Sequence, residues 1–273
     1  MNNKKLSVLA KLYIALIIFF LYAPIVVMAL FSFNSTPSTY IFSEFSTKWW
    51  TEMFRNSAAM QALKSTILLA VVSAIVSTVL GTLAAVGIYN YTNKRLKSVV
   101  MSVTNIPMMN PEIVTGISMM LLFVFSAHLL NKANALNFWS LLIAHVTFCL
   151  PYVILNVLPK LRQFDINIYE AAVDLGCKPL AAFFKVVMPN ITSGIITGLV
   201  MSFTLSLDDF IISYFTSGPS FQTLPIYIFS LTKKRVKPDM YALSTLIFAV
   251  ILVLLILLNI AQLRAQKGKS EKK

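Results

Sequence analysis

Residues 12–33 have the sequence LYIALIIFFLYAPIVVMALFSF, which contains no charged side chain. A helix needs about 20 apolar residues to cross the hydrocarbon core of a bilayer, which is roughly 30 Å thick. The apolar core of a cleaved signal peptide is shorter, at roughly 7–15 residues, and a small-residue cleavage site follows it. This run is longer and no clear site of that kind follows it. We therefore expect an uncleaved membrane helix.

The rest of the chain repeats this pattern. Hydrophobic residues make up 58% of the sequence and charged residues 12%, and the apolar residues come in long blocks. A soluble domain carries about twice that share of charge. Because lipid offers the backbone no hydrogen-bond partner, spanning segments fold as helices. We expect an all-α, polytopic membrane protein, one domain over residues 1–273, with six transmembrane helices at 12–33, 63–91, 99–130, 138–158, 191–215 and 243–263.

The distribution of Lys and Arg predicts the orientation of these spans, because cytoplasmic loops carry an excess of both residues. Of the 23 Lys and Arg residues, fifteen fall on the side that holds both termini, the basic tail 264–273 and the loop 160–189. We expect that side to be cytoplasmic. The other eight include a cluster at 233–237 that works against the rule; they are Lys48, Arg55, Lys64, Lys132, Lys233, Lys234, Arg235 and Lys237.

Several classes of function are not supported by the sequence. The formal net charge is +13, but the basic residues flank membrane segments and do not form a patch with aromatic residues, so we expect no nucleic-acid partner. Cys149, Cys177, His128 and His145 lack the spacing of metal ligands. The sequence has no phosphate-binding glycine loop, nucleophile elbow or zinc-protease helix. We expect no catalytic centre, metal or cofactor on this chain, and any energy source must lie on another one.

The loop 160–189 reads as two short helices. Asp165 or Asn167 can cap the first helix, and Gly176 at its end suits a left-handed backbone conformation. Pro179 fits the first turn of the second helix, and Pro189 is expected to end it before the next span.

Between those ends lies the polar island Glu-Ala-Ala-Val-Asp-Leu-Gly, residues 170–176. Ala171 and Ala172 have almost no side chain, so the backbone of a partner can approach them closely, and Glu170 adds one charge for a hydrogen bond or ion pair. Tight packing between two helices of the same chain is the alternative use of such small residues.

This loop resembles the EAA motif of ABC-importer permeases, in which Glu-Ala-Ala is followed at fixed spacing by a Gly and by an Ile-x-Leu-Pro ending. Val186 and Met188 stand where Ile and Leu are usual, and both changes conserve size and polarity. In that family the first loop helix docks in a cleft of a cytoplasmic ATPase. The resemblance therefore implies a type I ABC-importer permease fold whose coupling loop includes Glu170, Ala171, Ala172, Asp174, Gly176 and Pro189.

The resemblance covers nearly the whole chain and looks closest to the C-type permease subunits of spermidine/putrescine importers. The segments that carry it are residues 32–35, 46–50, 144–151, 202–209, 218–220 and 224–225. It implies a transport subunit, not an enzyme, in a bacterial inner (plasma) membrane. Its implied partners are a second permease subunit, a cytoplasmic ATPase dimer that binds ATP and Mg, an extracellular or periplasmic polyamine-binding protein, the lipid bilayer and the polyamine.

Three acids fall inside the predicted spans: Glu112, Asp208 and Asp209. Ionisable residues at membrane depth are costly and mark functional sites. With a rise of about 1.5 Å per residue, Glu112 lies about 18–20 Å from the cytoplasmic end of its span, and the two aspartates about 26 Å from theirs. Polyamines carry several ammonium groups, which carboxylates along a pathway can bind through charge-assisted hydrogen bonds. The three acids are therefore our candidates for the substrate pathway.

Each acid also has a structural alternative. Asp208 and Asp209 lie about 100° apart on a helix, so at most one faces the pathway squarely and the other is expected to cap a backbone group or pair with the partner subunit. Asn110 and Pro111 before Glu112 suggest a helix restart, with Asn110 as cap and Pro111 in the first turn. Glu112 is then either a capping acid or a pathway acid.

Small residues recur at every fourth position on two of the spans, where they allow close approach of another helix. Packing within the chain and packing against a second subunit are both open; the residues are Ser73, Ser77, Gly81 and Ala85 on one span and Gly194, Gly198 and Ser202 on the other.

Two other functions fit part of the sequence. An importer for another cation or a small anion would share the loop motif, but carboxylates inside the membrane argue against an anion. An ATP-independent secondary transporter would need neither the loop motif nor an ATPase, and no inverted repeat is detectable.

Overall fold

The computed structural model describes residues 8–36, 38, 41–132, 134–233 and 239–270. Within these ranges every regular segment is helical, apart from an isolated β-bridge between Asn34 and Phe45. The chain forms two compact units, residues 1–60 with 230–256 and residues 61–229 with 257–273. The single domain over residues 1–273 stays a prediction.

The all-α fold is confirmed in the described part of the chain, with five helical segments of membrane length and a shorter apolar segment where the sixth was predicted. Five helical segments are long and apolar enough to cross a membrane, and a shorter apolar segment, Met240–Val253, lies within α12 (Asp239–Ser270). The five are Leu9–Phe31 in α1 (Val8–Phe31), α3 (Ser57–Asn90), α5 (Glu112–Leu129), α6 (Phe138–Arg162) and Pro179–Asp208, which ends with α9 (Met188–Asp208).

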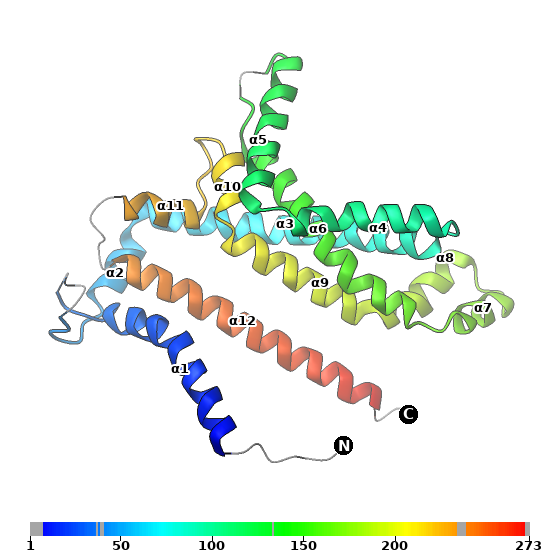
Figure 1. The fold of residues 1–273 in the computed structure, drawn as a ribbon, viewed down its shortest axis with the longest axis horizontal. Helices are drawn as coiled ribbons and strands as arrows, with labels where there is room; N and C mark the ends of the chain where they lie inside the picture. Colours follow the sequence, from blue (N-terminus) through cyan, green and yellow to red (C-terminus); the bar gives the residue numbers. More distant parts are fainter. Residues whose placement is uncertain (1–7, 37, 39–40, 133, 234–238, 271–273) are drawn as a thin grey trace. The chain divides into compact units, whose positions relative to one another are not determined.

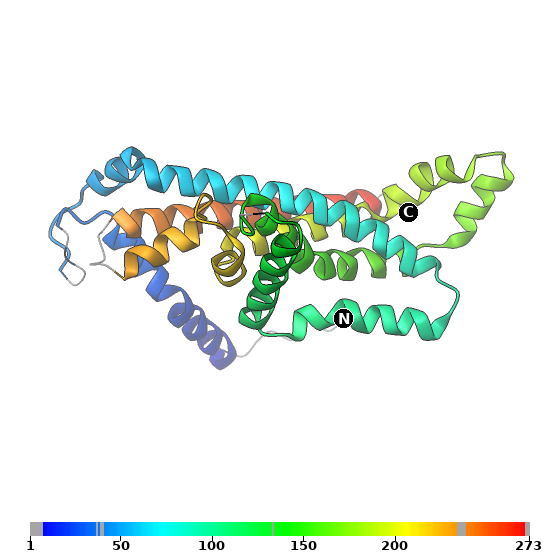
Figure 2. The same ribbon diagram turned by 90° about the horizontal axis from the view of Figure 1, so that it is seen from above.

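Two of the predicted continuous spans are wrong in their bounds, because the chain breaks inside them. The run 99–130 divides into α4 (Lys94–Met109) and α5, between which the chain turns sharply (Figures 1 and 2). Asn110 has extended dihedral angles (φ −80°, ψ 137°), which is the conformation favoured before a proline. The run 191–215 divides likewise into α9 and α10 (Ile211–Thr216).

Helix α6 is the centre of the second unit. One buried cluster joins it to α3 and α9 through Ala85, Val153, Val157 and Ile191. Phe148 and Cys149, one turn or more away from that cluster, pack with Ile212 of α10 in another. Because α6 has neighbours on several sides, it is buried along much of its length, as a membrane helix is when it contacts protein instead of lipid.

The small-residue stripes serve packing within the chain. A Cβ atom at Gly81 of α3 would lie 2.6 Å from Val153 Cβ, and one at Gly198 of α9 would lie 3.2 Å from Val153 Cα. A Cβ atom at Gly194 would lie 2.7 Å from the carbonyl oxygen of Asn156. Helices α3 and α9 therefore approach α6 closely at glycines, which confirms the first of the two alternatives.

Helix α11 (Leu224–Thr232) is tied to α3 by a hydrogen bond from the Leu224 N–H to Thr66 Oγ1 (2.7 Å). The preceding loop packs at Gly218, where a Cβ atom would overlap the carbonyl group of Leu136. These two contacts fix the segment that follows α10 against the ends of α3 and α6.

The first unit contains α1 and the short amphipathic helix α2 (Lys48–Arg55), joined by a folded loop. Asn34 organises this loop: its side-chain amide donates to Ile41 O (2.8 Å) and its side-chain oxygen accepts from Ser43 N (2.9 Å). The indole Nε1 of Trp49 donates to Asn34 O (2.6 Å), so α2 is fastened to the same residue.

Candidate functional site

The first helix of the 160–189 loop is α7 (Ile166–Asp174), and both of its predicted ends are confirmed. Asp165, not Asn167, is the cap: its carboxylate accepts the Asn167 N–H (3.1 Å). Gly176 has a φ of +89°, and the Cys177 N–H donates to Ala172 O (3.1 Å), which closes the helix as in a Schellman motif. The turn therefore depends on a residue that tolerates positive φ.

The helix presents its motif residues to the outside of this chain. Glu170, Ala171 and Asp174 are exposed, and Leu175 is 90% exposed. Among the described residues, no heavy atom lies within 4 Å of a Cβ atom built on Gly176. Tight packing inside the chain therefore does not explain these small residues, whereas an accessible turn beside an exposed leucine suits a protein partner.

Pro189 does not end the second loop helix, so that prediction is wrong. Helix α8 (Pro179–Ala182) begins at Pro179 as expected, then continues through the π-helical segment η1 (Phe183–Val187) into α9. Proline lacks an N–H and its ring clashes with the carbonyl group four residues earlier. The wider π turn just before Pro189 relieves that conflict, so the loop and the membrane span form one continuous helical segment.

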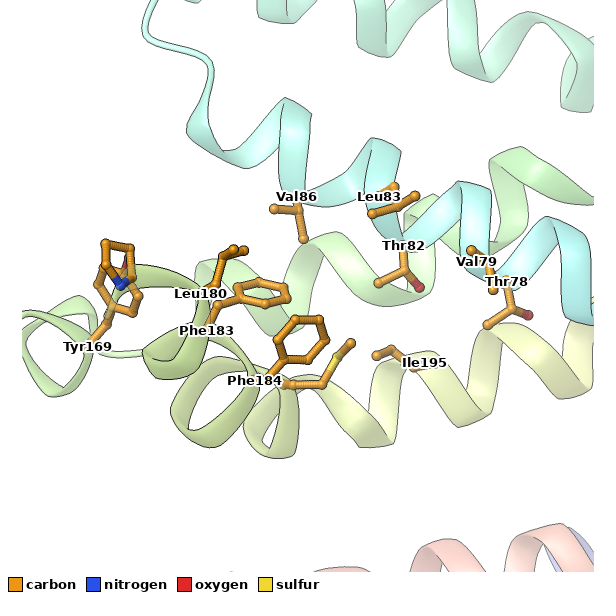
Figure 3. Close-up of a pocket in the computed structure, with 12 residues that line it drawn as sticks. Thr78, Val79, Thr82, Leu83, Val86, Tyr169, Leu180, Phe183, Phe184 and Ile195 are labelled. Carbon is orange, nitrogen blue, oxygen red and sulfur yellow. The ribbon is translucent and has the colours of Figure 1, made fainter. Parts of the chain in front are cut away.

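A groove of about 620 Å³ lies between the loop helices and the membrane helices α3 and α9. Figure 3 shows Leu83 and Val86 of α3 on one side and the rings of Phe183 and Phe184 on the other. Its lining contains no charged residue among those the structure describes there. The groove therefore lacks the carboxylates that a polycation requires, and it is not a candidate for the substrate pathway.

Glu112 is the first residue of α5, and the predicted capping by Asn110 is wrong. Pro111 occupies the cap position, while the side-chain amide of Asn110 donates to Thr115 Oγ1 (3.3 Å). The depth of about 18–20 Å assumed one straight helix from residue 99 with a rise of about 1.5 Å per residue, which the break removes. The Glu112 side chain is exposed on this chain and sits in the first turn of α5, where the helix dipole favours an acid.

Asp208 and Asp209 differ in environment, but the helical spacing assumed for them does not apply, because Asp209 lies beyond the end of α9 with extended dihedral angles (φ −62°, ψ 125°). Asp208 ends α9 and is exposed. Asp209 is buried, and its two carboxylate oxygens accept the backbone N–H groups of Ile212 (3.3 Å) and Ser213 (2.7 Å). Asp209 therefore caps α10 from inside the protein, and Asp208 is the one left accessible.

Helix α5 packs on α10 one turn after Glu112. Gly116, one turn after Glu112, packs on α10: a Cβ atom there would lie 3.5 Å from Ile211 O. The Glu112 face of α5 therefore meets α10, which follows Asp208 after two residues. Glu112 and Asp208 are exposed carboxylates that border this contact between α5 and α10, and carboxylates of this kind can bind a cation.

Sequence reasoning missed a buried polar cluster behind this site. His145 of α6 has both ring nitrogens in hydrogen bonds, Nδ1 with Ser206 Oγ (2.8 Å) and Nε2 with Ser213 Oγ (2.9 Å). Ser73 Oγ lies 2.8 Å from Ser206 Oγ, and Asp209 Oδ2 lies 3.5 Å from His145 Nε2. The cluster links α3, α6, α9 and α10.

Comparison with known proteins identifies the family. The family model described as binding-protein-dependent transport system inner membrane component matches residues 77–268. The chain belongs to this family. It is 37% identical over 251 residues to the spermidine/putrescine transport system permease protein PotC of Escherichia coli K12, covering 92% of each chain. It is also 38% identical over 232 residues to the putrescine transport system permease protein PotI of the same organism, covering 85% of this chain and 83% of PotI.

Solved structures agree on the fold. A bacterial ABC transporter involved in the import of the acidic polysaccharide alginate contains a chain that superposes with a TM-score of 0.73 at 16% identity, over 93% of this chain and 94% of that one. The prediction of an ABC-importer permease fold is confirmed. Because the relatives are transport permeases of the inner membrane, the chain is a transport subunit and not an enzyme.

Proposed function

We propose that this chain is one membrane-spanning permease subunit of an ATP-driven importer for polyamines, spermidine or putrescine. The observation that carries the proposal is the likeness to PotC and PotI over most of the chain. The site supports the same cargo chemically. Glu112 and Asp208 are exposed where α5 packs on α10, and carboxylates repel an anion and attract an ammonium group.

The partners we propose follow from the family and from the loop. A binding protein outside the membrane delivers the polyamine, a second permease subunit completes the pathway, and a cytoplasmic ATPase dimer binds ATP and Mg. Helix α7 is the docking element for the ATPase, since Glu170, Ala171 and Leu175 are exposed on it. When ATP binding closes the ATPases, α7 moves with them and the pathway turns from inward-facing to outward-facing. ATP hydrolysis and product release then reset it.

Movement at α7 has a direct route into the membrane. The residues after Gly176 lead through α8 and η1 into α9 as one helical segment, and α9 ends at Asp208. We propose that this segment transmits the motion of the ATPase to the α9–α10 break. A helical segment from Pro179 to Asp208, which begins four residues after the end of α7 and its cap, supports this proposal.

We propose that the chain lies in a bacterial inner membrane with both termini in the cytoplasm. In this orientation fifteen of the 23 Lys and Arg residues lie on the cytoplasmic side, as the positive-inside rule requires. A fluorescent protein fused to the C-terminus should fold and fluoresce, whereas alkaline phosphatase fused there should be inactive. The opposite pair of results would reverse the orientation.

The experiment that tests the proposed function is uptake of labelled spermidine and putrescine by the assembled transporter in proteoliposomes, with and without ATP. Uptake should require ATP, the ATPase and the binding protein. An equal uptake without ATP would show a secondary transporter, and uptake of another solute in place of polyamines would show an importer with a different cargo.

A further inference from the structure

His145 bridges the break in the second unit. It lies on α6, Ser206 lies near the end of α9 and Ser213 lies on α10, so one imidazole ring holds the two helices on either side of the break. The ring is 1% exposed. Along the chain, α9 and α10 are joined by residues 209 and 210, which lie outside both helices.

Burying an imidazole inside a membrane domain is costly unless its nitrogens are hydrogen-bonded. Here each nitrogen has a serine hydroxyl as partner, and because a hydroxyl can donate or accept, both neutral tautomers are satisfied. Ser73 extends the cluster to α3 through Ser206. An apolar side chain could fill the space of this ring without any of the three serines. We therefore interpret the cluster as a device that holds polar groups in place, which apolar packing alone does not do.

What the cluster positions is the pair of aspartates. Ser213 contacts His145 with its hydroxyl and Asp209 with its backbone N–H, and Asp209 Oδ2 lies 3.5 Å from His145 Nε2. These three residues form a closed set of contacts that holds the Asp209 carboxylate inward. Because the adjacent Asp208 ends α9 and leaves the protein interior, fixing Asp209 also fixes the direction of Asp208.

We propose that His145 is a positioning residue for substrate: through Nε2 it holds Ser213 and Asp209 at the start of α10, so that Asp208, and not Asp209, meets the polyamine. This inference rests on the proposed polyamine function for its transport readout, but the geometry itself does not depend on the cargo. His145 is not placed in contact with substrate, and it acts through Asp208.

Two amide variants of His145 test whether its hydrogen bonds position Asp209 or whether the ring only fills space in the core. The side-chain amide of Gln reaches the position of Nε2, so His145→Gln keeps the contact with Ser213 and Asp209. The amide of Asn reaches only the position of Nδ1, so His145→Asn keeps the contact with Ser206 and loses the others. If His145 positions Asp209, the Gln variant should behave like the wild type and the Asn variant like His145→Ala.

The first readout is the KM for spermidine uptake by the complete transporter. Loss of one hydrogen bond to a charged group corresponds to roughly a tenfold change in affinity, so His145→Asn and His145→Ala should raise KM about tenfold with little change in the maximal rate. In an Asp208→Asn background the same substitutions should change KM no further, because a residue that acts through Asp208 loses its effect with it. Additive effects, or a wild-type KM in His145→Asn, would overturn the proposal.

The second readout needs no cargo. In the assembled transporter with Cys149→Ala and Cys177→Ser, Asp208→Cys should react with a small cationic methanethiosulfonate reagent, and Asp209→Cys should not. Adding His145→Asn should slow the reaction at position 208 about tenfold, whereas His145→Gln should leave it unchanged. Equal rates in all three backgrounds would overturn the proposal. If the Asp208→Cys variants react as expected but the transporter with the native Asp208 imports no polyamine, only the proposed cargo would be overturned.

Discussion

Asp208 and Asp209 are neighbours in the sequence and face opposite environments. The carboxylate of Asp209 accepts two backbone N–H groups at the start of α10 and is buried, whereas Asp208 ends α9 and is exposed. The two acids therefore have different tasks, one in the architecture of the α9–α10 break and one at its surface. A capping role for one of the two acids was predicted, and the structure shows that Asp209 has it. Contact of Asp208 with the substrate stays a prediction.

Asp208→Asn should impair transport without loss of protein. The substitution keeps the size of the side chain and removes the charge that attracts an ammonium group, so KM for spermidine should rise roughly 10–100-fold, which corresponds to a charged hydrogen bond. Uptake kinetics at matched protein levels measure this. A KM equal to that of the wild type would place the substrate pathway elsewhere.

Asp209→Ala should lower stability. Loss of a helix cap costs about 1–2 kcal/mol, and the buried N–H groups of Ile212 and Ser213 would be left without an acceptor. Asp209→Asn is the graded control, because its single amide oxygen can accept only one of the two N–H groups, so its loss of stability should be smaller than that of Asp209→Ala. Thermal unfolding of the purified complex in detergent compares the two, and equal loss in both variants would contradict a capping role.

Gly176→Val should separate the permease from the ATPase. The φ of +89° disfavours a β-branched residue by about 1–2 kcal/mol, so the turn after α7 should change conformation although the described surroundings leave space for a side chain. Gly176→Asn is the control, since Asn tolerates positive φ better than other residues. Co-purification with the ATPase should fail for Val and be retained for Asn; retention in both would show that the turn geometry is not needed for docking.

Gly194→Ala and Gly87→Ala should have opposite effects. At Gly194 a methyl group would lie 2.7 Å from Asn156 O, so close packing of α9 on α6 would be lost at a cost of about 1–3 kcal/mol. At Gly87 the described residues leave the position open, and Ala should stabilise helix α3 by about 0.5–1 kcal/mol. Thermal unfolding measures both changes, and a similar change in the two variants would argue against close contact at Gly194.

Local chemistry was enough to predict much of this structure. The apolar runs gave the spans because composition and length decide membrane insertion. The ends of α7 were readable because an aspartate cap and a left-handed glycine act within a few residues. The turn between α4 and α5 was predicted only in part. Asn110 and Pro111 indicated where a helix restarts, but the continuous apolar run did not indicate that the chain changes direction there.

The rest depends on contacts between distant residues. His145 lies 61 positions from Ser206 and 68 from Ser213, and neither spacing is that of metal ligands or catalytic residues, so no motif in the sequence indicated that these residues meet. Pro189 was predicted to end a helix because proline inside a helix usually breaks it. The π turn that accommodates Pro189 has no sequence signal that we recognised. A serine at a small-residue position facing a lone histidine in another span is the pattern that could have suggested the cluster.

The central claim is that this chain moves polyamines when an ATPase acts on it through α7. The most direct measurement is uptake of labelled spermidine into proteoliposomes that contain the assembled transporter and its binding protein, comparing the native ATPase with one that binds but cannot hydrolyse ATP. The account predicts accumulation with the native ATPase and none with the inactive one. Equal accumulation with both, or no spermidine uptake by the native complex, would contradict it.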